Sequence, residues 1–297
     1  MSEFRIDQIK SQDATRGPDV AGITTFTGTS GIVMPSGNTA ARNSTYDGDY
    51  IGGDNLYLWL SGDNYDGGTQ WKDKTDNDRH FDLYRYGSDH VLTEFTQTQL
   101  DNVKALRFGR YDDTANDSGA YNYYAQRQMS GTIFSNPGNG NFTIQYWTYF
   151  LSGRYVVSTG GQTGSTGFTM HDNGEGGSPP DYFVSVKDGT SQYSSRYNDD
   201  GLGKGWVNHA LVWNNDGSSP QEKLKYFQNG VIQSTTIVSS SSQTDTQTLW
   251  TIGVPNNDKT NNYAGEFWMS DLKAYDRALS EYEVGVNYNG LKAKHGV

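Results

Sequence analysis

Short apolar runs alternate with clusters of glycine, asparagine and aspartate from about residue 50 to the end of the chain. The clearest runs are LYLWL (56–60), VKALRFG (103–109), FTIQYWTYF (142–150), DYFVSVK (181–187), VNHALVW (207–213), LKYFQNGVIQSTTIV (224–238), LWTIG (249–253) and EFWMSDLKAYD (266–276). Short strands separated by turn residues at this spacing are typical of a β-sandwich or β-barrel. Asn229 and Gly230, inside one of these runs, tolerate positive φ and predict a tight type I′ hairpin.

One segment near the C-terminus has helical rather than strand spacing. Ser280 and Glu283 form a capping-box pattern at its start. The pair Asn289-Gly290 permits a left-handed cap and predicts where the helix ends. The expected apolar face of this helix consists of Leu279, Tyr282, Val286 and Leu291.

The composition indicates a β-rich, loop-rich domain with an aromatic core. The 297 residues include 36 Gly, which suits turns, and a hydrophobic content of only 33%. The hydrophobic residues nevertheless include 7 Trp, 21 Tyr and 12 Phe, whose large side chains supply large buried areas. The chain has no cysteine, so disulfides, thiolate metal sites and cysteine nucleophiles are excluded.

The net charge of −11 argues against a nucleic-acid partner, whose phosphates need a basic face. Residues 1–45 hold four basic and four acidic residues, so the whole excess negative charge falls in 46–297. No stretch of about 18 apolar residues exists, and we expect no membrane insertion. The first residues lack the basic segment and apolar run of a signal peptide, so we expect synthesis in a cytoplasm and release by another route.

Two blocks of sequence carry a family resemblance. In GKGWVNHALVWNNDG followed by LKYFQNG, the matching positions are Trp206, His209, Val212, Tyr226, Asn229 and Gly230. In YAGEFWMSDLKAYDRALSEYEV they are Gly265, Asp271, Tyr275, Ala278, Leu279, Ser280 and Glu283. A weaker third block joins NVKALRFGRYDD to NFTIQYWTYF. Together they resemble the laminin-G-like and pentraxin-like branch of the concanavalin A-like lectin/glucanase superfamily.

That resemblance implies an all-β fold, a two-sheet antiparallel jelly-roll sandwich with one short C-terminal helix. We expect the sandwich to occupy 46–297 and an extended N-terminal arm to occupy 1–45. Lectins, hydrolases and adhesion modules all share this fold, so the fold alone does not decide the function.

The hydrolase possibility is tested by the spacing of carboxylates. A retaining glucanase needs two carboxylates about 5.5 Å apart on one face, as in Glu-x-Asp-x-Glu, and no such string occurs. In the nearest acidic strand, Glu266 and Asp271 have an odd separation and point to opposite faces unless a bulge intervenes. Signatures of serine hydrolases and zinc peptidases are absent. His209 is expected to be a packed, hydrogen-bonded structural residue. We expect no catalytic site and no enzyme activity.

Aspartates gather in turn-rich stretches and raise the hypothesis of a calcium site. The residues concerned are Asp66, Asp73, Asp76 and Asp78. Calcium takes several carboxylate and carbonyl oxygens, and the resemblance adds that pentraxin-like relatives bind calcium in edge loops. Asp also stabilises turns without any ion, and the EF-hand spacing is not met. The sequence favours the turn interpretation, and calcium stays the one cofactor hypothesis.

Aromatic residues offer candidates for ligand binding. The segment YNYYAQRQ clusters Tyr121, Tyr123 and Tyr124 beside Arg127. Tyrosine rings stack on sugar rings, but tyrosine and arginine are equally enriched at protein–protein contacts. The sequence does not separate a glycan site from a protein-contact site here.

The first 45 residues resemble an N-terminal segment of virion structural proteins from marine cyanobacterial phages. The resemblance lies in FRIDQIK, Gly17-Pro18, GITTF (22–26) and PSGNT (35–39). The apolar anchors of this arm are Phe4, Ile6, Val20, Ile23 and Phe26. So short a segment cannot bury its own apolar side chains, and we expect it to order against another copy or another virion protein.

These observations favour a phage structural protein, a capsid-surface or tail-fibre subunit that decorates the particle. We expect a homo-oligomer, attached to other virion proteins through its arm, that touches host-surface glycans. It would be located in the virion, assembled in the host cytoplasm and released by lysis. The alternative is a bacterial lectin or a glycan-active enzyme.

Overall fold

The computed structural model of the chain describes residues 55–85, 97–100, 102–111, 121–129, 131–152, 155–159, 165–172, 182–197, 204–233, 236–240, 248–255 and 266–297. The arm predicted at 1–45, with its five apolar anchors, lies outside the described residues. Among the described residues no helix has the length and apolar character needed to cross a membrane.

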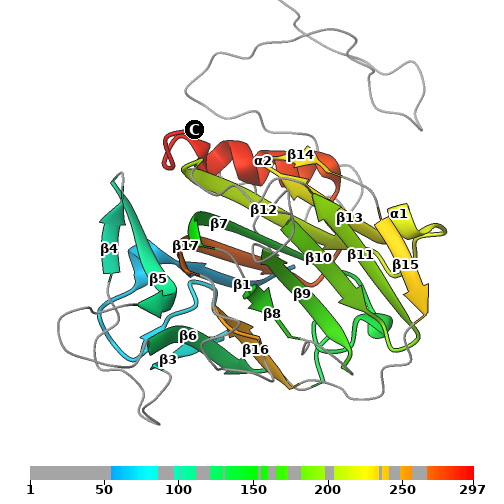
Figure 1. Ribbon diagram of the computed structural model, residues 1–297, viewed down its shortest axis with the longest axis horizontal. Coiled ribbons are helices and arrows are strands. Elements are labelled where there is room, and N and C mark those ends of the chain that lie inside the picture. The colour runs from blue at the N-terminus through cyan, green and yellow to red at the C-terminus, as the bar shows by residue number, and fades with distance from the viewer. Residues whose placement is uncertain are drawn as a thin grey trace, which may run out of the picture. The chain divides into compact units, whose positions relative to one another are not determined.

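Two antiparallel sheets make up the described fold (Figure 1). The first, which we call the helix-side sheet, runs in the order β4 (Gln97–Leu100), β5 (Val103–Tyr111), β17 (Glu266–Tyr275), β7 (Phe142–Ser152), β12 (Trp206–Trp213), β13 (Leu224–Gln228) and β14 (Val231–Ile232). Strand β1 (Leu56–Ser61) also pairs with β17, beyond the end of β5.

The second sheet runs in the order β2 (Gln70–Trp71), β3 (Phe81–Arg85), β6 (Tyr121–Gln128), β16 (Leu249–Ile252), β8 (Tyr155–Ser158), β9 (Gly167–Asp172), β10 (Tyr182–Lys187), β11 (Ser191–Tyr197) and β15 (Thr236–Ser240). Strand β5 belongs to both sheets, because Leu106–Phe108 pair with β17 and Gly109–Tyr111 pair with β6. The predicted two-sheet antiparallel sandwich is confirmed.

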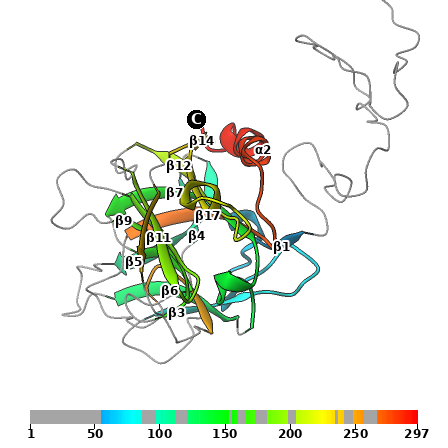
Figure 2. The same cartoon turned by 90° about the vertical axis from the view of Figure 1, so that its right-hand side faces the viewer.

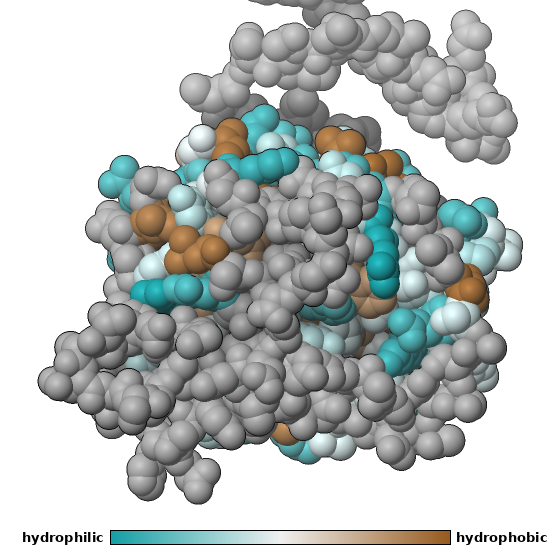
Figure 3. All heavy atoms as spheres, viewed as in Figure 1, coloured by the Kyte–Doolittle hydropathy of each residue, from teal (hydrophilic) through white to brown (hydrophobic). Residues whose placement is uncertain are grey.

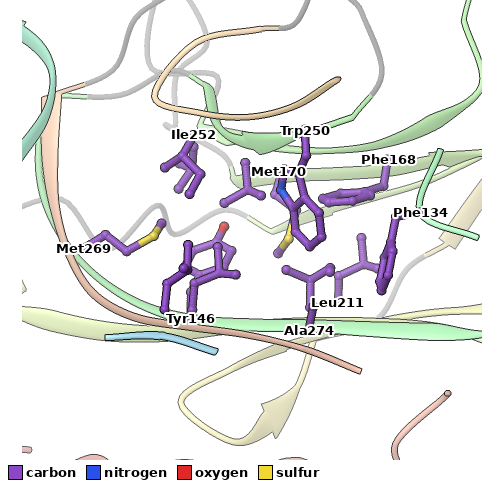
Figure 4. Close-up of a cluster of buried hydrophobic side chains, with 14 of the residues drawn as sticks. Phe134, Tyr146, Phe168, Met170, Leu211, Trp250, Ile252, Met269 and Ala274 are labelled. Carbon is purple, nitrogen blue, oxygen red and sulfur yellow. The ribbon is translucent and has the colours of Figure 1, made fainter. Parts of the chain in front are cut away.

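The space between the sheets is filled by one large apolar cluster (Figure 4). Tyr146, Leu211 and Ala274 enter it from the helix-side sheet, and Phe168, Met170, Trp250 and Ile252 enter it from the second sheet (Figure 4). The Trp250 ring packs edge-on against Phe81 and Phe168, at centroid distances of 5.7 and 5.4 Å. The hydrophobic content is only 33%, but the large aromatic side chains within it thus supply much of the buried area.

The predicted type I′ hairpin joins β13 to β14. Asn229 has φ 51° and Gly230 has φ 74°, the left-handed conformation that this turn requires. A side chain at Gly230 would also come within 2.9 Å of the Tyr288 ring. Both the turn and the close packing therefore favour glycine at this position.

His209 lies inside the sandwich, where the sequence predicted a packed structural residue. Its side chain is fully buried, its Nδ1 shares a 2.7 Å hydrogen bond with the Tyr226 hydroxyl, and its ring stacks on Tyr182 at 4.3 Å. Burial lowers the pKa of His209 from 6.5 to about 3, so the imidazole is neutral near pH 7.

Helix α2 (Glu281–Lys292) lies along the outer surface of the helix-side sheet, beside β12 and β14 in both views (Figures 1 and 2). The capping box predicted at Ser280 and Glu283 is present. The predicted apolar face is wrong in part, because Tyr282 is 79% exposed while Val284 and the polar Asn287 are buried. Asn287 donates hydrogen bonds to Gln145 and to the Tyr275 hydroxyl, which satisfies its buried amide. The predicted end at Asn289-Gly290 is also early, since α2 runs on to Lys292.

The remaining helical pieces are short. They are η2 (Gly62–Asn64), η3 (Pro137–Asn139) and α1 (Pro220–Lys223). Helix α1 carries a second capping box, formed by Ser219 and Glu222, and buries none of its own residues. Helix α1 is therefore a surface turn that contributes no side chain to the core.

Candidate functional site

The sequence-predicted tyrosine cluster lies on β6 but does not form one surface. Tyr123 packs against the core cluster, whereas Tyr124 stacks on Tyr84 of β3 at 5.2 Å. The Arg127 guanidinium donates hydrogen bonds to the backbone carbonyls of Asp78 and His80. The side chain of Tyr121 lies outside the described residues. The alternation of β6 therefore sends Tyr124 to the face opposite Tyr123, and Arg127 holds a loop in place.

Two of the four predicted calcium ligands, Asp73 and Asp66, are engaged by protein donors, whereas Asp76 and Asp78 are exposed. The Asp73 carboxylate accepts hydrogen bonds from the backbone N–H groups of Trp59, Thr75 and Arg79, and from the Thr75 hydroxyl. Asp66 pairs with Lys72 at 2.5 Å, and these contacts lower the pKa of Asp66. Among the described residues, no three histidine or acidic side chains come together as metal ligands. The geometry fits the turn interpretation, and calcium binding stays a prediction.

A bulge in β17 changes the expectation for the acidic strand. The register with β7 shifts between Met269 and Asp271, so Ser270 and Asp271 both face α2. Glu266 and Asp271 consequently share the outer face of the strand, contrary to the simple odd-spacing argument. Each is held by a different cation, since Glu266 pairs with Arg107 and Asp271 with Lys294. Two carboxylates neutralised by separate cations do not form an acid–nucleophile pair.

The small cavity beneath α2 is too small for a ligand. It has a volume of about 10 Å³, room for roughly one water molecule. Its lining residues are Gln145, Trp147, Asn208, Asp271, Lys273, Asn287 and Leu291. Burial acts to raise the pKa of Asp271, but the charges of Lys294, His295 and Lys273 outweigh burial and hold the pKa below its usual value. The cavity belongs to the packing of α2 on the sheet.

The outward-facing side chains of the second sheet form two parallel rows that cross it from β3 to β11. Alternate residues of a strand point to opposite faces, and the residues between those of the rows lie in the core cluster. One row, the hydroxyl row, contains Asp82, Gln126, Thr251, Ser158, Thr169, Ser185 and Ser194, which are paired strand by strand. Beside it lies the aromatic row, which is two positions away on most strands and three on the bulged β8, and has no member on β16; it contains Tyr84, Tyr124, Tyr155, His171, Phe183 and Arg196.

Rings of the aromatic row contact one another across the strands. His171 stacks on Tyr155 at a centroid distance of 4.9 Å and meets Phe183 at 4.8 Å. The Arg196 guanidinium lies 5.4 Å from the centre of the Phe183 ring, within cation–π range. The rings therefore hold one another as a preformed surface.

This outer face is buried in its middle and partly exposed at both ends, since Asp82 and Tyr84 at the β3 end are partly exposed as well. In the middle, Ser158 and Thr251 are fully buried and hydrogen-bond each other at 3.1 Å. Towards β11, Phe183 and Ser194 are partly exposed and Arg196 is exposed. We call this part the β9–β11 face, made of His171, Phe183, Lys187, Gln192, Ser194 and Arg196. Flat aromatic area beside hydroxyl and amide groups is the chemistry that binds a sugar, whose ring has apolar C–H faces and polar edges.

The β9–β11 face contains none of the ligand-binding residues predicted from the sequence. Its signal is the alternation in YFVSVK and SQYSSRY, where Phe183, Ser185 and Lys187 share one face of β10. The alternation alone does not tell which strands pair. Assembling Phe183, His171 and Arg196 into one row needs the register, which the sequence does not give.

A family model described as concanavalin A-like lectin/glucanases superfamily, of the laminin G type, matches residues 118–285. The match covers more than half of the chain, and the chain belongs to this superfamily. No curated protein matches the sequence.

Several solved structures share the fold. They include the binding domain of botulinum neurotoxin DC in complex with rat synaptotagmin II (14% identity, TM-score 0.53) and the same domain in complex with SialylT (12%, 0.53), each covering 80% of this chain and 52% of its own. A third comes from work on cell entry of botulinum neurotoxin type C through two ganglioside molecules (13%, 0.54), covering 80% and 51%. The chain thus spans about half the length of these structures, and identities this low show the fold alone.

Proposed function

We propose that this chain is a non-enzymatic, glycan-binding structural subunit of a phage virion, which contacts host-surface glycans through the β9–β11 face. The observation that carries glycan binding is the aromatic row beside the hydroxyl row at the β9–β11 end of the second sheet. Membership of a lectin-bearing superfamily supports it. The printed names of structural neighbours, which mention SialylT and gangliosides, are consistent with it.

The described surface lacks the broad apolar patch of an obligate protein interface. Its exposed large apolar side chains lie singly on different elements, and on the face drawn in Figure 3 the described apolar residues form only small spots. A polar face with a few aromatic rings fits a glycan better than an apolar partner protein. The virion assignment rests on the resemblance of residues 1–45 to phage structural proteins.

A glycan array probed with the full chain tests the binding function. Phe183→Ala is expected to lower the affinity for the glycans that bind the full chain about tenfold, equivalent to roughly 1.4 kcal/mol. The reason is that the variant removes the ring that the sugar would cover. Tyr282→Ala is the matched control, since it removes an exposed aromatic ring from α2. Absence of any retained glycan, or equal binding by Phe183→Ala, would overturn the site.

Two further measurements address the remaining parts of the proposal. A reducing-sugar assay on every retained glycan is expected to show no hydrolysis, because Glu266 and Asp271 on the acidic strand pair with separate cations and do not form an acid–nucleophile pair. Turnover abolished by changing Glu266 or Asp271 would establish the enzyme alternative. Immunogold labelling of intact phage particles is expected to place the protein on their surface, and unlabelled particles would exclude the virion role.

A further inference from the structure

Lys187 is a nearly buried cation on the outward side of the second sheet. Only 7% of its surface is exposed, although its side chain points away from the core, on the same side of β10 as Phe183 and Ser185. Its neighbours in register are Gly167 on β9 and Gln192 on β11, neither of which carries a charge. Lysine is almost never buried to this extent without a partner.

No described carboxylate pairs with the Lys187 ammonium. The acidic residue next in sequence, Asp188, uses one carboxylate oxygen to accept hydrogen bonds from the backbone N–H groups of Thr190 and Ser191 and from the Thr190 hydroxyl. These contacts keep the Asp188 carboxylate in the turn between β10 and β11. Burial lowers the pKa of Lys187, the effect expected of an ammonium that loses water without gaining a counter-ion.

A desolvated ammonium such as that of Lys187, with no described carboxylate beside it, favours the binding of an anion. The negative charge of a ligand would compensate for the hydration that the ammonium loses on burial. Gly167 lies opposite Lys187 and has no side chain to fill the space beside the ammonium. Lys187 and Phe183 are four residues apart on one strand, roughly 13 Å along the β10 axis. That span is longer than a single sugar ring, so an occupant that reaches both would be an oligosaccharide.

We propose that Lys187 forms an anionic subsite at one end of the β9–β11 face and binds a carboxylate or sulfate of an acidic glycan while Phe183 and His171 hold a neighbouring sugar ring. The inference rests on the proposed glycan-binding function and names its ligand class. The net charge of −11 strengthens the argument. A strongly acidic protein repels polyanions at long range, so a preference for acidic glycans has to come from a local cation.

The test uses matched glycan pairs that differ only in their charged group: a uronic acid against its neutral hexose, and a sulfated sugar against its unsulfated form. For the full chain we expect at least tenfold tighter binding of the acidic member. Lys187→Gln should abolish that preference by weakening binding of the acidic member, and Lys187→Arg should retain it. Lys104→Gln removes an equal charge from an exposed position on β5 and should change nothing.

The outcomes separate the two proposals. Equal binding of acidic and neutral members by the unaltered chain, or a preference that survives in Lys187→Gln, would overturn the anionic subsite while glycan binding stands. Loss of all binding in Phe183→Ala with no acidic preference would confine recognition to the aromatic row. If no glycan of either kind binds, both proposals fall. Comparison of the uronic-acid and sulfate pairs shows which anion the subsite takes.

A second readout follows the Lys187 side chain directly in the unaltered protein and uses one conservative variant only to assign its signal. Lysine side chains carrying ¹³C-methyl groups give one NMR signal each, and Lys187→Arg assigns the signal of Lys187. Added glucuronate, and separately sulfate, should shift this signal, whereas glucose at the same concentration should not. A Lys187 signal that responds equally to glucose and glucuronate would contradict an anionic subsite.

Discussion

His209 illustrates how a histidine, a residue type common in catalytic sites, can have a purely structural role. Its imidazole is enclosed by the rings of Tyr146, Tyr182 and Phe150 and hydrogen-bonds Tyr226. Because burial lowers its pKa from 6.5 to about 3, the folded protein leaves it neutral at pH values where the unfolded chain protonates it. Between these pH values the unfolded state binds more protons, so stability falls as pH drops below 6.5.

The His209→Phe variant tests this linkage. Between pH 6.5 and pH 4.5 the unaltered protein should lose about 2 kcal/mol more unfolding free energy than the variant, since one pKa unit corresponds to roughly 1.4 kcal/mol. Urea unfolding at several pH values measures both proteins. Above pH 7 the two pH profiles should run parallel, which serves as an internal control. Identical slopes below pH 6.5 would show that His209 is protonated in the folded state.

Asp73 separates the turn interpretation from the calcium hypothesis. Its four hydrogen bonds tie the β1 edge to the following loop, and Asp73→Ala should cost about 2–4 kcal/mol because it leaves buried donors unpaired. Thermal unfolding with and without a chelator decides between the two interpretations. We expect the chelator to leave the melting temperature unchanged in both proteins. A chelator-induced drop in the unaltered protein that disappears in Asp73→Ala would instead establish a calcium site.

At the scale of elements, the helix cap at Ser280 is a point where sequence and structure agree. The Ser280 hydroxyl accepts a hydrogen bond from the Glu283 N–H, and the Glu283 carboxylate accepts one in return from the Ser280 N–H. Ser280→Ala should therefore cost about 1 kcal/mol of unfolding free energy. Ser219→Ala removes the same motif from α1, which buries none of its residues, and should have a clearly smaller effect in chemical denaturation. Equal effects would show that α2 contributes no more than α1 to global stability.

Strands that are buried on both faces are the easiest to recognise in a sequence. Trp206–Trp213 is buried along its whole length, between the core and α2, and reads as a continuous apolar run. Ser191–Tyr197 has an exposed polar face and only two buried residues, so the apolar pattern did not reveal it. The buried face of α2 was misread for a related reason. Asn287 looks like a surface residue until its partners Gln145 and Tyr275, from distant strands, are known.

The candidate site was less predictable than the fold because it depends on register. The tyrosine cluster of β6 is compact in sequence, but the pleat sends Tyr123 and Tyr124 to opposite faces. Phe183, His171 and Arg196 come from three strands and meet only through their pairing. A bulge at Ser270 and Asp271 likewise moved a carboxylate to the other face. Such shifts leave little trace in a single sequence.

At the scale of the molecule, the two sheets have different tasks. Helix α2 covers the outer surface of the helix-side sheet, where the His295 ring stacks on Trp147 at 4.0 Å and hydrogen-bonds Ser270 at 2.6 Å. The part of that surface beneath α2 and His295 is therefore occupied by packing contacts within the domain. The second sheet keeps aromatic and charged side chains at its β9–β11 end, where His171, Phe183 and Arg196 contact one another, and this is the end that we propose meets a ligand.

Deletion of residues 1–45 tests the division of the chain into an arm and a sandwich. The described core residues all lie between Leu56 and Val284, so the shortened protein should unfold cooperatively within a few degrees of the full chain. Glycan binding should be retained, because the β9–β11 face lies in 171–196. Incorporation into phage particles should be lost, because the arm is the proposed anchor. Circular dichroism, the glycan array and labelling of reconstituted particles measure the three properties.

Substitution of Ile23 and Phe26 by Asp should reproduce the loss of incorporation without the deletion, since an unpaired carboxylate in an apolar interface costs several kcal/mol. Replacing the exposed Val231 by Asp is the control, because it adds a charge to the sandwich surface without changing residues 1–45. A sandwich that fails to fold without residues 1–45 would show that the arm is an integral part of the domain. Normal incorporation of the shortened protein would place the anchor on the sandwich itself.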